Sequence, residues 1–228
     1  MMSTSCRNDA GSDQRNGKSA HIRPAFLISA GVFWLLGIIT CLALIARQNS
    51  APGRAGEIPQ VWPSASHLVL NPNKPTLIMF AHPHCPCTRA SLLELDQLLA
   101  DCQGQLDAQV WFVKPPGTEE NWTNTDLWSK AAAIPGVTAH CDVDGIEAQR
   151  FQAETSGQTL LYNPAGKLLF RGGITIARGH AGDNPGLDGV EGLLKNNLTN
   201  LVQTPVFGCE LAAELLGTNQ TTCVACKR

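Results

Sequence analysis

The sequence lacks an excess of positive charge. Its 17 Lys and Arg residues are balanced by 19 Asp and Glu residues, and the formal net charge is −2. Binding of nucleic acid generally requires a basic surface, so nucleic acid is not expected as a partner. The glycines at 172–173 and 179–186 also lack the strand–G-x-G–helix context of a phosphate-binding loop and are interpreted as turn residues. The sequence therefore gives no sign of a nucleic-acid or phosphate site.

Charge is also absent from one long stretch near the N-terminus. Residues 25–46 read AFLISAGVFWLLGIITCLALIA. A helix of about 20 apolar residues crosses the hydrocarbon core of a bilayer. A cleavable signal peptide has a shorter apolar region, of about 7–15 residues, and ends in an A-x-A-like site that is missing here. Residues 25–46 are therefore predicted to form an uncleaved transmembrane helix.

The basic residues around this stretch predict its orientation. More of them precede it than follow it closely: Arg7, Arg15, Lys18 and Arg23 against Arg47 and Arg54. The positive-inside rule then keeps residues 1–24 in the cytoplasm and places the remainder in the periplasm or another extracytoplasmic space. Residues 1–24 are polar and irregular and are predicted to be disordered. Residues 47–61 mix Pro, Gly, Ser and Arg without periodicity and predict a flexible linker.

Most of the nine cysteines follow the predicted transmembrane helix and would face a compartment in which disulfides persist. They are Cys85, Cys87, Cys102, Cys141, Cys209, Cys223 and Cys226. Cys85 and Cys87 stand out because they lie in the sequence HPHCPCTR, between the short apolar run 76–81 and residues 90–99, whose apolar side chains recur at helical spacing. The first pattern predicts a buried strand and the second a helix. Two thiols are therefore expected at a strand-to-helix junction.

The chemistry of this junction favours a reactive thiolate. Pro86 suits the first position of a helix, which makes Cys85 the N-cap residue. The free backbone N–H groups and the positive end of the helix dipole both stabilise a thiolate there. Arg89 adds a positive charge if its side chain folds back, and His84 is a candidate proton acceptor. The pattern predicts a redox-active or metal-binding pair, with a structural disulfide as the alternative.

The rest of the chain alternates between strands and helices. We predict strands at 109–113 and 137–143, helices at 125–132 and 146–153, a hairpin of 159–162 and 167–171 around a turn at 163–166, and a closing amphipathic helix at 188–202. Such alternation implies an α/β domain with a mixed sheet covered on both faces. The domain is expected at residues 62–208, followed by a cysteine-containing tail at 209–228.

This order of elements, with a cysteine pair where the first core strand meets its helix, resembles the thioredoxin-like superfamily. The resemblance covers roughly residues 62–204 and is closest to its membrane-tethered extracytoplasmic members. More narrowly, AHPHCPCTRAS, DLW-x3-AAIPGV, RGGIT, RGHAGDN and TPVFGC resemble the bacterial proteins called RedB. The resemblance implies a thioredoxin-like mixed sheet flanked by helices and thiol–disulfide exchange with protein thiols or disulfides, without a cofactor. Cys85 would then be the nucleophile and Cys87 the resolving thiol.

Two features depart from thioredoxins. The pair is Cys-x-Cys rather than Cys-x-x-Cys, so a disulfide between Cys85 and Cys87 would close a smaller and more strained ring, and strain makes a disulfide a better oxidant. In addition, residues 156–159 read SGQT at the place where relatives carry a cis-proline that keeps metal away from the thiols. The second departure opens room for a metal.

The sequence therefore leaves two alternatives beside the oxidoreductase. In one, Cys85, Cys87 and His180 bind or deliver copper, because two thiolates and an imidazole suit Cu(I). His180 as an ordinary loop residue competes with that reading. In the other, the domain is a non-catalytic interaction module whose Cys-x-Cys forms a static disulfide. Cys223 and Cys226 in the tail are expected to pair with each other or to serve Cys85 and Cys87 as a labile thiol pair.

Overall fold

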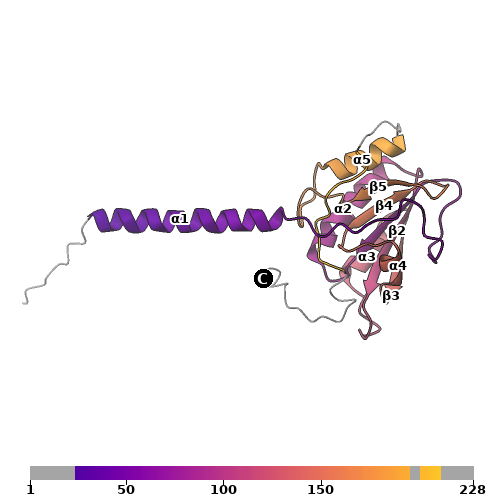
Figure 1. Ribbon diagram of the computed structural model, residues 1–228, viewed down its shortest axis with the longest axis horizontal. Coiled ribbons are helices and arrows are strands. Elements are labelled where there is room, and N and C mark those ends of the chain that lie inside the picture. The colour runs from indigo at the N-terminus through magenta and orange to yellow at the C-terminus, as the bar shows by residue number, and fades with distance from the viewer. Residues whose placement is uncertain (1–23, 196–200, 212–228) are drawn as a thin grey trace, which may run out of the picture. The chain divides into compact units, whose positions relative to one another are not determined.

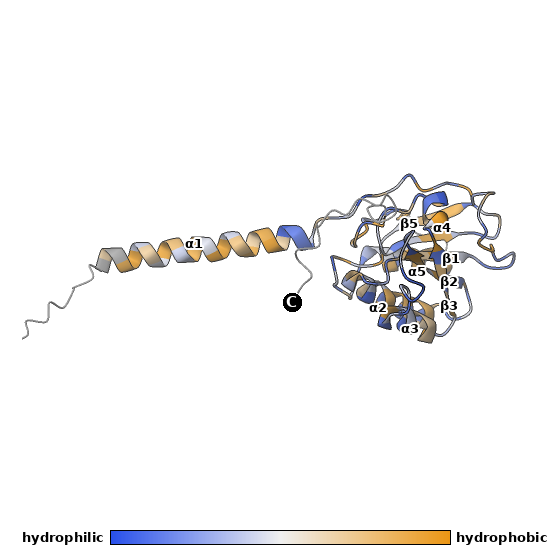
Figure 2. Ribbon diagram, turned by 90° about the horizontal axis from the view of Figure 1, so that it is seen from below, coloured by the Kyte–Doolittle hydropathy of each residue, from blue (hydrophilic) through white to orange (hydrophobic). Residues whose placement is uncertain are grey.

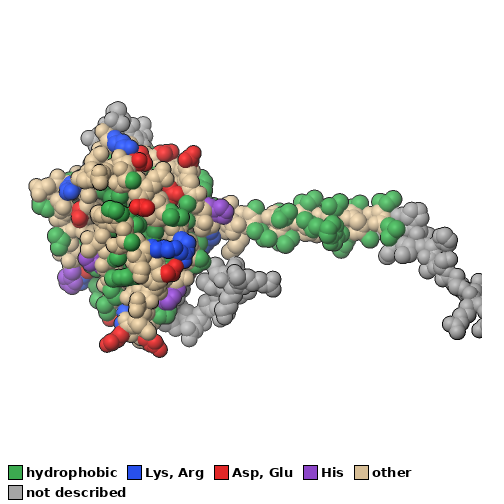
Figure 3. Space-filling model, turned by 180° about the vertical axis from the view of Figure 1, so that it is seen from behind, with side chains coloured by type: hydrophobic (Ala, Val, Ile, Leu, Met, Phe, Trp, Pro, Cys, Tyr) green, Lys and Arg blue, Asp and Glu red, His purple; other side chains and the backbone are tan. Residues whose placement is uncertain are grey.

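The computed structural model describes residues 24–195 and 201–211, which divide into two units after Ile45. The first unit is essentially the helix α1 (Pro24–Asn49), whose last residues extend into the second. Its side chains are overwhelmingly apolar and exposed (Figures 2 and 3). Within the described residues, Leu27–Asn49 is the one helix that is long and apolar enough to cross a membrane. This agrees with the apolar helix predicted for residues 25–46.

The second unit is built on a five-stranded mixed sheet with the strand order β3-β2-β1-β4-β5 (Figure 1). Strands β1, β2 and β3 are parallel, whereas β4 is antiparallel to β1 and β5 is antiparallel to β4. The strands are β1 (Thr76–Ala81), β2 (Asp107–Lys114), β3 (Val137–Val143), β4 (Gln158–Tyr162) and β5 (Leu168–Gly172). This is the thioredoxin-like α/β arrangement predicted from the sequence.

Helices cover both faces of the sheet. One face packs against α2 (Pro86–Asp101), α3 (Asp126–Ala133) and α5 (Pro185–Lys195). The other face packs against α4 (Ile146–Arg150) and against the chain that precedes β1. The additional α3–β3–α4 segment lies between β2 and β4 in the chain, and β3 extends the parallel side of the sheet.

The position of β1 at the centre of the sheet explains why its sequence is an apolar run. All six of its residues are buried. Leu77 and Met79 face the helices of the first layer, whereas Ile78 and Phe80 face the opposite layer. Side chains alternate between the two faces of a strand, so a strand covered on both faces needs apolar residues at every position. The predicted bounds of this strand, 76–81, are confirmed.

Two predicted helices differ in extent from the structure. The last one begins at Pro185 rather than at 188, because the Asn184 Oδ1 atom accepts a hydrogen bond from the Leu187 N–H (2.8 Å) and caps a proline-initiated turn. Its described part ends at Lys195, and residues 201–202 are not helical. Helix α4 ends at Arg150 rather than at 153, and Gln152 beyond it has a positive φ of 53°. The predictions for residues 1–23, 196–200 and 212–228 lie outside the described residues.

Residues 53–61, which the sequence predicts to be a flexible linker, instead pack along the domain. The Gly53 N–H donates to the Val206 carbonyl oxygen (2.7 Å), and the Tyr162 hydroxyl donates to the Pro59 carbonyl oxygen (2.8 Å). Ile58 is only 4% exposed and joins the core on the α4 face of the sheet. Composition alone suggested a tether, but tertiary hydrogen bonds and one apolar anchor hold this segment in place.

This packing makes a stability test possible. Replacing Ile58 with alanine should lower the free energy of unfolding by about 2–5 kcal/mol, as for other buried Ile-to-Ala substitutions. The matched control is Val61→Ala in the same segment, because Val61 is 65% exposed, and the expected change is within about 0.5 kcal/mol. Chemical denaturation of the detergent-solubilised chain, followed by tryptophan fluorescence, measures both. Equal stability of the two variants would restore the linker interpretation.

Candidate functional site

The junction between β1 and α2 positions Cys85 at a helix N-terminus. Pro86 is the first residue of α2, and Cys85 is its N-cap with extended backbone angles (φ −84°, ψ 117°). The Cys85 carbonyl oxygen accepts a hydrogen bond from the Thr88 N–H (3.0 Å), as an N-cap residue does. The side chain of Cys85 does not close the additional capping hydrogen bond that Ser or Asp would make. The predicted start of the helix is confirmed.

Cys85 is buried but lines a cleft. The residue is 1% exposed, compared with 9% for Cys87. The cleft has a volume of about 500 Å³ and is lined by Pro83, His84, Cys85, Pro86, Arg89, Thr125, Asp126 and Leu127. Its wall is formed by the β1–α2 junction on one side and the start of α3 on the other. A reagent that reaches the Cys85 sulfur from this side must therefore enter between these two helix N-termini.

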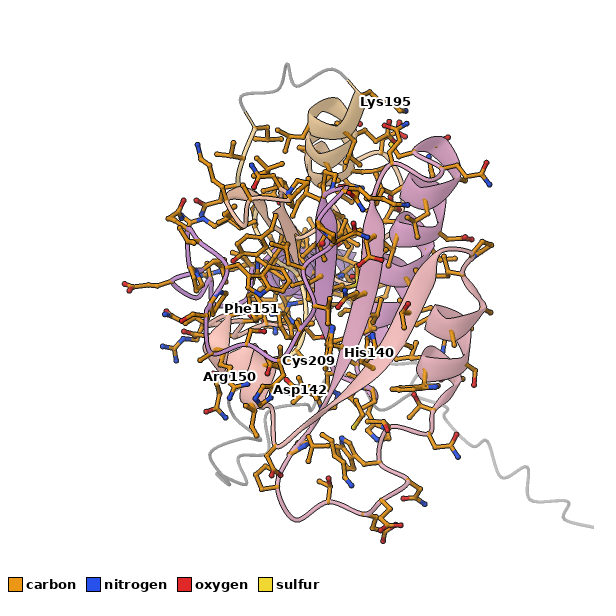
Figure 4. All side chains as sticks on the ribbon, turned by 90° about the vertical axis from the view of Figure 1, so that its right-hand side faces the viewer. His140, Asp142, Arg150, Phe151, Lys195 and Cys209 are labelled. Carbon is orange, nitrogen blue, oxygen red and sulfur yellow. The ribbon has the colours of Figure 1, made fainter. Side chains whose placement is uncertain are left out.

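A third cysteine, Cys209 (labelled in Figure 4), forms a side-chain hydrogen bond with Cys85. It belongs to residues 203–211, a segment that we call the strap. The strap runs antiparallel to the loop that precedes β4, with Thr155 paired to Glu210. The Ser156 N–H donates to the Cys209 carbonyl oxygen (2.8 Å), and the Leu211 N–H donates to the Glu154 carbonyl oxygen (2.7 Å). The strap thus pairs with the loop through an isolated β-bridge and two backbone hydrogen bonds.

The strap can approach so closely because residue 208 is a glycine. A Cβ atom on Gly208 would lie 1.9 Å from the Ser156 carbonyl oxygen, which is far inside van der Waals contact. On its other side, the Arg178 guanidinium donates from Nη1 to the Gly208 carbonyl oxygen (2.6 Å) and from Nε to the Ala51 carbonyl oxygen (3.2 Å). Arg178 therefore holds Gly208, the residue before Cys209, close to Ser156.

Ser156 connects the strap to the cysteine junction. Besides its backbone bond to Cys209, its Oγ atom accepts a hydrogen bond from the His82 N–H (2.9 Å) and lies 2.9 Å from the Thr88 hydroxyl. Thr88 also donates to the His82 carbonyl oxygen (3.2 Å). Ser156 is the first residue of the stretch 156–159, where the sequence resemblance places a cis-proline, and its polar atoms bond to both the strap and the junction between β1 and α2.

These neighbours lower the pKa of the Cys85 thiol. The main causes are hydrogen bonds from the side chain of Cys209 and then from the side chain of Cys87, and burial opposes them. The backbone N–H groups of Cys209 and Cys87 lower the pKa further. The sequence predicts a lowered pKa for Cys85 on account of the helix N-terminus. In the structure the largest cause is instead a thiol from a distant part of the chain.

Cys209 is the functional candidate that sequence reasoning missed. It was placed in the C-terminal tail, apart from the predicted domain at 62–208. One signal was available, because the motif TPVFGC ends on this cysteine. Nothing in local spacing, however, says that Cys209 meets Cys85, since this contact depends on how the strap packs on the loop before β4.

His84 and His82 form an aromatic group with Trp122 above the junction. The His84 and Trp122 rings are 4.4 Å apart between centroids, and the His82 and Trp122 rings are 6.1 Å apart. The His84 Nε2 atom lies 3.1 Å from the Trp122 carbonyl oxygen, a contact that requires the proton to be on Nε2. Its Nδ1 atom then carries the lone pair in the neutral ring. This arrangement is compatible with the predicted role of His84 as a proton acceptor.

The other two predicted site residues lie differently. Arg89 lines the cleft and forms an ion pair with Asp126, with which it shares the cleft wall. His180 is exposed in the loop between β5 and α5, and its Nδ1 atom lies 2.7 Å from the Arg178 carbonyl oxygen. Across residues 24–195 and 201–211, no three His, Cys, Asp or Glu side chains are grouped as metal ligands.

Six cysteines lie in the described part of the chain. They are Cys41, Cys85, Cys87, Cys102, Cys141 and Cys209. Cys102, the C-cap residue of α2, is buried in the core, and burial raises the pKa of its thiol. Cys141 is half-buried on β3. These two cysteines provide controls for the thiols of the site. The predicted tail pair, Cys223 and Cys226, lies outside the described residues.

Comparison with known proteins supports the fold. No family model matches the chain, and no curated protein matches it. An uncharacterized conserved protein from Geobacillus kaustophilus is similar in structure, with 17% identity, a TM-score of 0.51, and coverage of 71% of this chain and 91% of that one. A hypothetical protein from Sinorhizobium meliloti is similar at 18% identity, with a TM-score of 0.52 and coverage of 70% and 93%.

A secreted Mycobacterium tuberculosis disulfide oxidoreductase, homologous to Escherichia coli DsbE, matches less well. It shares 17% identity with a TM-score of 0.38, and the match covers 55% of this chain and 82% of that one. The two similarities with TM-scores above 0.5 show the fold, and at these identities they show nothing about activity.

The assignment of the lowered pKa can be tested by titration. Replacing Cys209 with alanine removes the largest cause, so the pKa of Cys85 should rise toward the ordinary thiol value of about 8.5. Cys141→Ala is the control and should leave the titration unchanged. The pKa is measured from ultraviolet thiolate absorbance, as the difference between each variant and the same variant with Cys85→Ser. An unchanged Cys85 pKa in Cys209→Ala would remove Cys209 from the site.

The same shift predicts how stability depends on pH. A lowered pKa in the folded state means that the unfolded chain binds more protons, so the reduced protein becomes more stable as pH rises toward the unfolded thiol value of about 8.5. This stability is lost as pH falls toward the native pKa of Cys85. Cys85→Ser should flatten this part of the profile, whereas Cys141→Ser should preserve it. Parallel profiles for wild type and Cys85→Ser would contradict the shift.

Proposed function

We propose that this chain is a membrane-anchored thiol–disulfide oxidoreductase that acts on protein thiols or disulfides outside the cytoplasm. The observation that carries the proposal is the environment of Cys85. This thiol sits at a helix N-cap, has a lowered pKa, and lines a cleft of about 500 Å³. The thiolate is the reactive form of cysteine, and a low-pKa thiol that can be reached from a cleft is suited to nucleophilic exchange. The resemblance to RedB proteins is consistent with this function but adds no mechanism.

The reaction proceeds by two successive exchanges. The Cys85 thiolate attacks one sulfur of a substrate disulfide, which forms a mixed disulfide and releases the other substrate sulfur as a thiolate. A second thiol of the protein then attacks the Cys85 sulfur and releases the remaining substrate thiolate. The substrate gains two electrons and the protein dithiol becomes a disulfide. An external dithiol reverses both exchanges and restores the reduced protein.

The cleft favours a narrow, extended substrate. Because Cys85 is almost fully buried, a substrate sulfur must reach it past His84 and the Arg89–Asp126 ion pair. A disulfide on an exposed loop or an extended peptide fits such an approach better than one buried in a folded domain. The exposed ring of His84 is placed to accept or donate the proton that exchange with a neutral thiol requires.

The helix α1 serves as the membrane anchor in this proposal. Its apolar side chains are exposed along its length, and burying them in lipid removes them from water. The excess of basic residues before it supports an orientation with the domain outside the cytoplasm. Protein disulfides persist in an oxidising compartment, so substrates for thiol–disulfide exchange are found there.

The activity is tested by disulfide reduction assays on the purified full-length chain. Insulin serves as a protein disulfide and an external dithiol as the electron source. Cys85→Ser should reduce turnover to the uncatalysed rate, because no other thiol of the site lines the cleft. Cys102→Ser is the control, because it removes a cysteine that lies in the core and outside the site. Full turnover in Cys85→Ser would exclude Cys85 as the nucleophile.

The topology is tested in intact cells stripped of their outer layers. Protease added to such spheroplasts should digest the chain beyond α1 while it spares the N-terminal 24 residues. A tag at each end of the chain reports which part survives, and lysed spheroplasts show that both parts can be cleaved. Protection of the domain until lysis would reverse the proposed orientation and place the thiols in a reducing compartment.

A further inference from the structure

The strap gives the site three thiols where a dithiol mechanism needs two. Cys85 and Cys87 are buried, whereas Cys209 is half-exposed. Cys209 is held by backbone hydrogen bonds to the loop before β4, and it therefore reaches Cys85 from a segment other than α2. Its segment pairs with this loop in the way that an added peptide strand pairs with a sheet edge. The chain thus presents one of its own cysteines to Cys85 as a bound cysteine peptide would.

We propose that Cys209 is the resolving thiol and that the oxidised form of the site is a Cys85–Cys209 disulfide. This inference rests on the proposed exchange function and concerns the second step of it. Cys87 then has a different role: its thiol donates a hydrogen bond to the Cys85 sulfur and helps to hold it as the thiolate. Cys209 is a catalytic residue in this account because it attacks the reacting sulfur itself.

Helix geometry favours Cys209 over Cys87 as the disulfide partner. Cys85 caps α2, and Cys87 is the second residue of the helix. The Cys87 thiol also reaches the Cys85 sulfur, but a disulfide between residues two apart in the chain closes a small and strained ring at the first turn of α2. That turn is tied down through Thr88, whose hydroxyl lies 2.9 Å from the Ser156 Oγ atom. A disulfide to Cys209 leaves α2 intact, because Cys209 approaches from a separate segment.

The arrangement also separates the incoming and outgoing sulfurs. Cys85 lines the cleft from which a substrate enters, and neither Cys209 nor Cys87 is among the residues that line it. A substrate held as a mixed disulfide on Cys85 therefore occupies the cleft, and Cys209 meets the Cys85 sulfur from the strap. The attacking Cys209 sulfur and the departing substrate sulfur therefore do not compete for the same space.

Cys209, as its thiolate, attacks the Cys85 sulfur of the mixed disulfide, and its proton passes to the solvent or to the departing sulfur. The Cys85–substrate S–S bond breaks, and the Cys85–Cys209 S–S bond forms. The substrate leaves as a thiol, two electrons having passed from the protein dithiol to the substrate disulfide. An external dithiol reduces the Cys85–Cys209 disulfide and resets the site.

The test uses the full-length chain in detergent, equilibrated with mixtures of reduced and oxidised glutathione. Free thiols are quenched with acid and alkylated, and mass spectrometry identifies each disulfide-linked peptide. The wild type, Cys87→Ser and the control Cys141→Ser should all form mainly the Cys85–Cys209 linkage. In Cys209→Ser, Cys85 should instead accumulate as a mixed disulfide with glutathione, by about tenfold or more, because the intramolecular competitor is lost.

A second variant tests the positioning while it keeps every thiol. Gly208→Ala places a methyl group against the Ser156 carbonyl oxygen and should push the strap away from the loop. We expect this variant to lose the Cys85–Cys209 linkage and to accumulate the glutathione adduct on Cys85. Retention of the linkage at the wild-type level would show that the strap does not position Cys209.

The outcomes separate this inference from the proposed function. If Cys209→Ser resolves as the wild type does, through a Cys85–Cys87 disulfide, the role of Cys209 is overturned and the oxidoreductase stands. A linkage of Cys209 to Cys223 or Cys226 in place of Cys85 also overturns it. If no form of the chain acquires a disulfide or a glutathione adduct at Cys85, the proposed function fails together with this inference.

Discussion

The backbone hydrogen bond between the Ser156 N–H and the Cys209 carbonyl oxygen, 2.8 Å long, is the constraint on which the thiol site depends. It joins two segments that are far apart in the sequence and places the third thiol against Cys85. Ser156 also contacts the junction between β1 and α2, because its hydroxyl oxygen accepts a hydrogen bond from the His82 N–H and lies against the hydroxyl of Thr88. One residue thereby sets the strap, the end of β1 and the first turn of α2 relative to one another.

The chemistry of Cys85 follows from a balance between burial and hydrogen bonding. Burial in a nearly closed site disfavours a thiolate and would by itself give an inert cysteine, as it does for Cys102. Hydrogen bonds from two neighbouring thiols outweigh burial at Cys85 and lower its pKa. The site therefore combines a charged sulfur with limited access, and the cleft between the starts of α2 and α3 supplies the access. In the proposed function, this packing accounts for both the reactivity of Cys85 and its selectivity.

Local patterns in the sequence predicted the elements well, and contacts between distant segments escaped prediction. The apolar run of β1 and the proline after Cys85 encode a buried strand and a helix start, so both were predicted with the right bounds. The helix predicted at 125–132 corresponds to α3, which Thr125 caps by accepting a hydrogen bond from the Trp128 N–H. In contrast, residues 53–61 look like a linker in composition, and only their tertiary contacts show otherwise. Cys209 was missed for the same reason, since its partner lies across the fold rather than along the chain.

The backbone hydrogen bonds of the strap can be measured directly. In the reduced full-length protein, amide hydrogen exchange should find the Ser156 and Leu211 N–H groups protected, because they donate to the Cys209 and Glu154 carbonyl oxygens. Their protection should resemble that of amides in the adjacent strand β4 and should fall together in Gly208→Ala. Exchange of both amides at the rate of an unstructured peptide would contradict the account, because the strap would then not hold Cys209 beside Cys85.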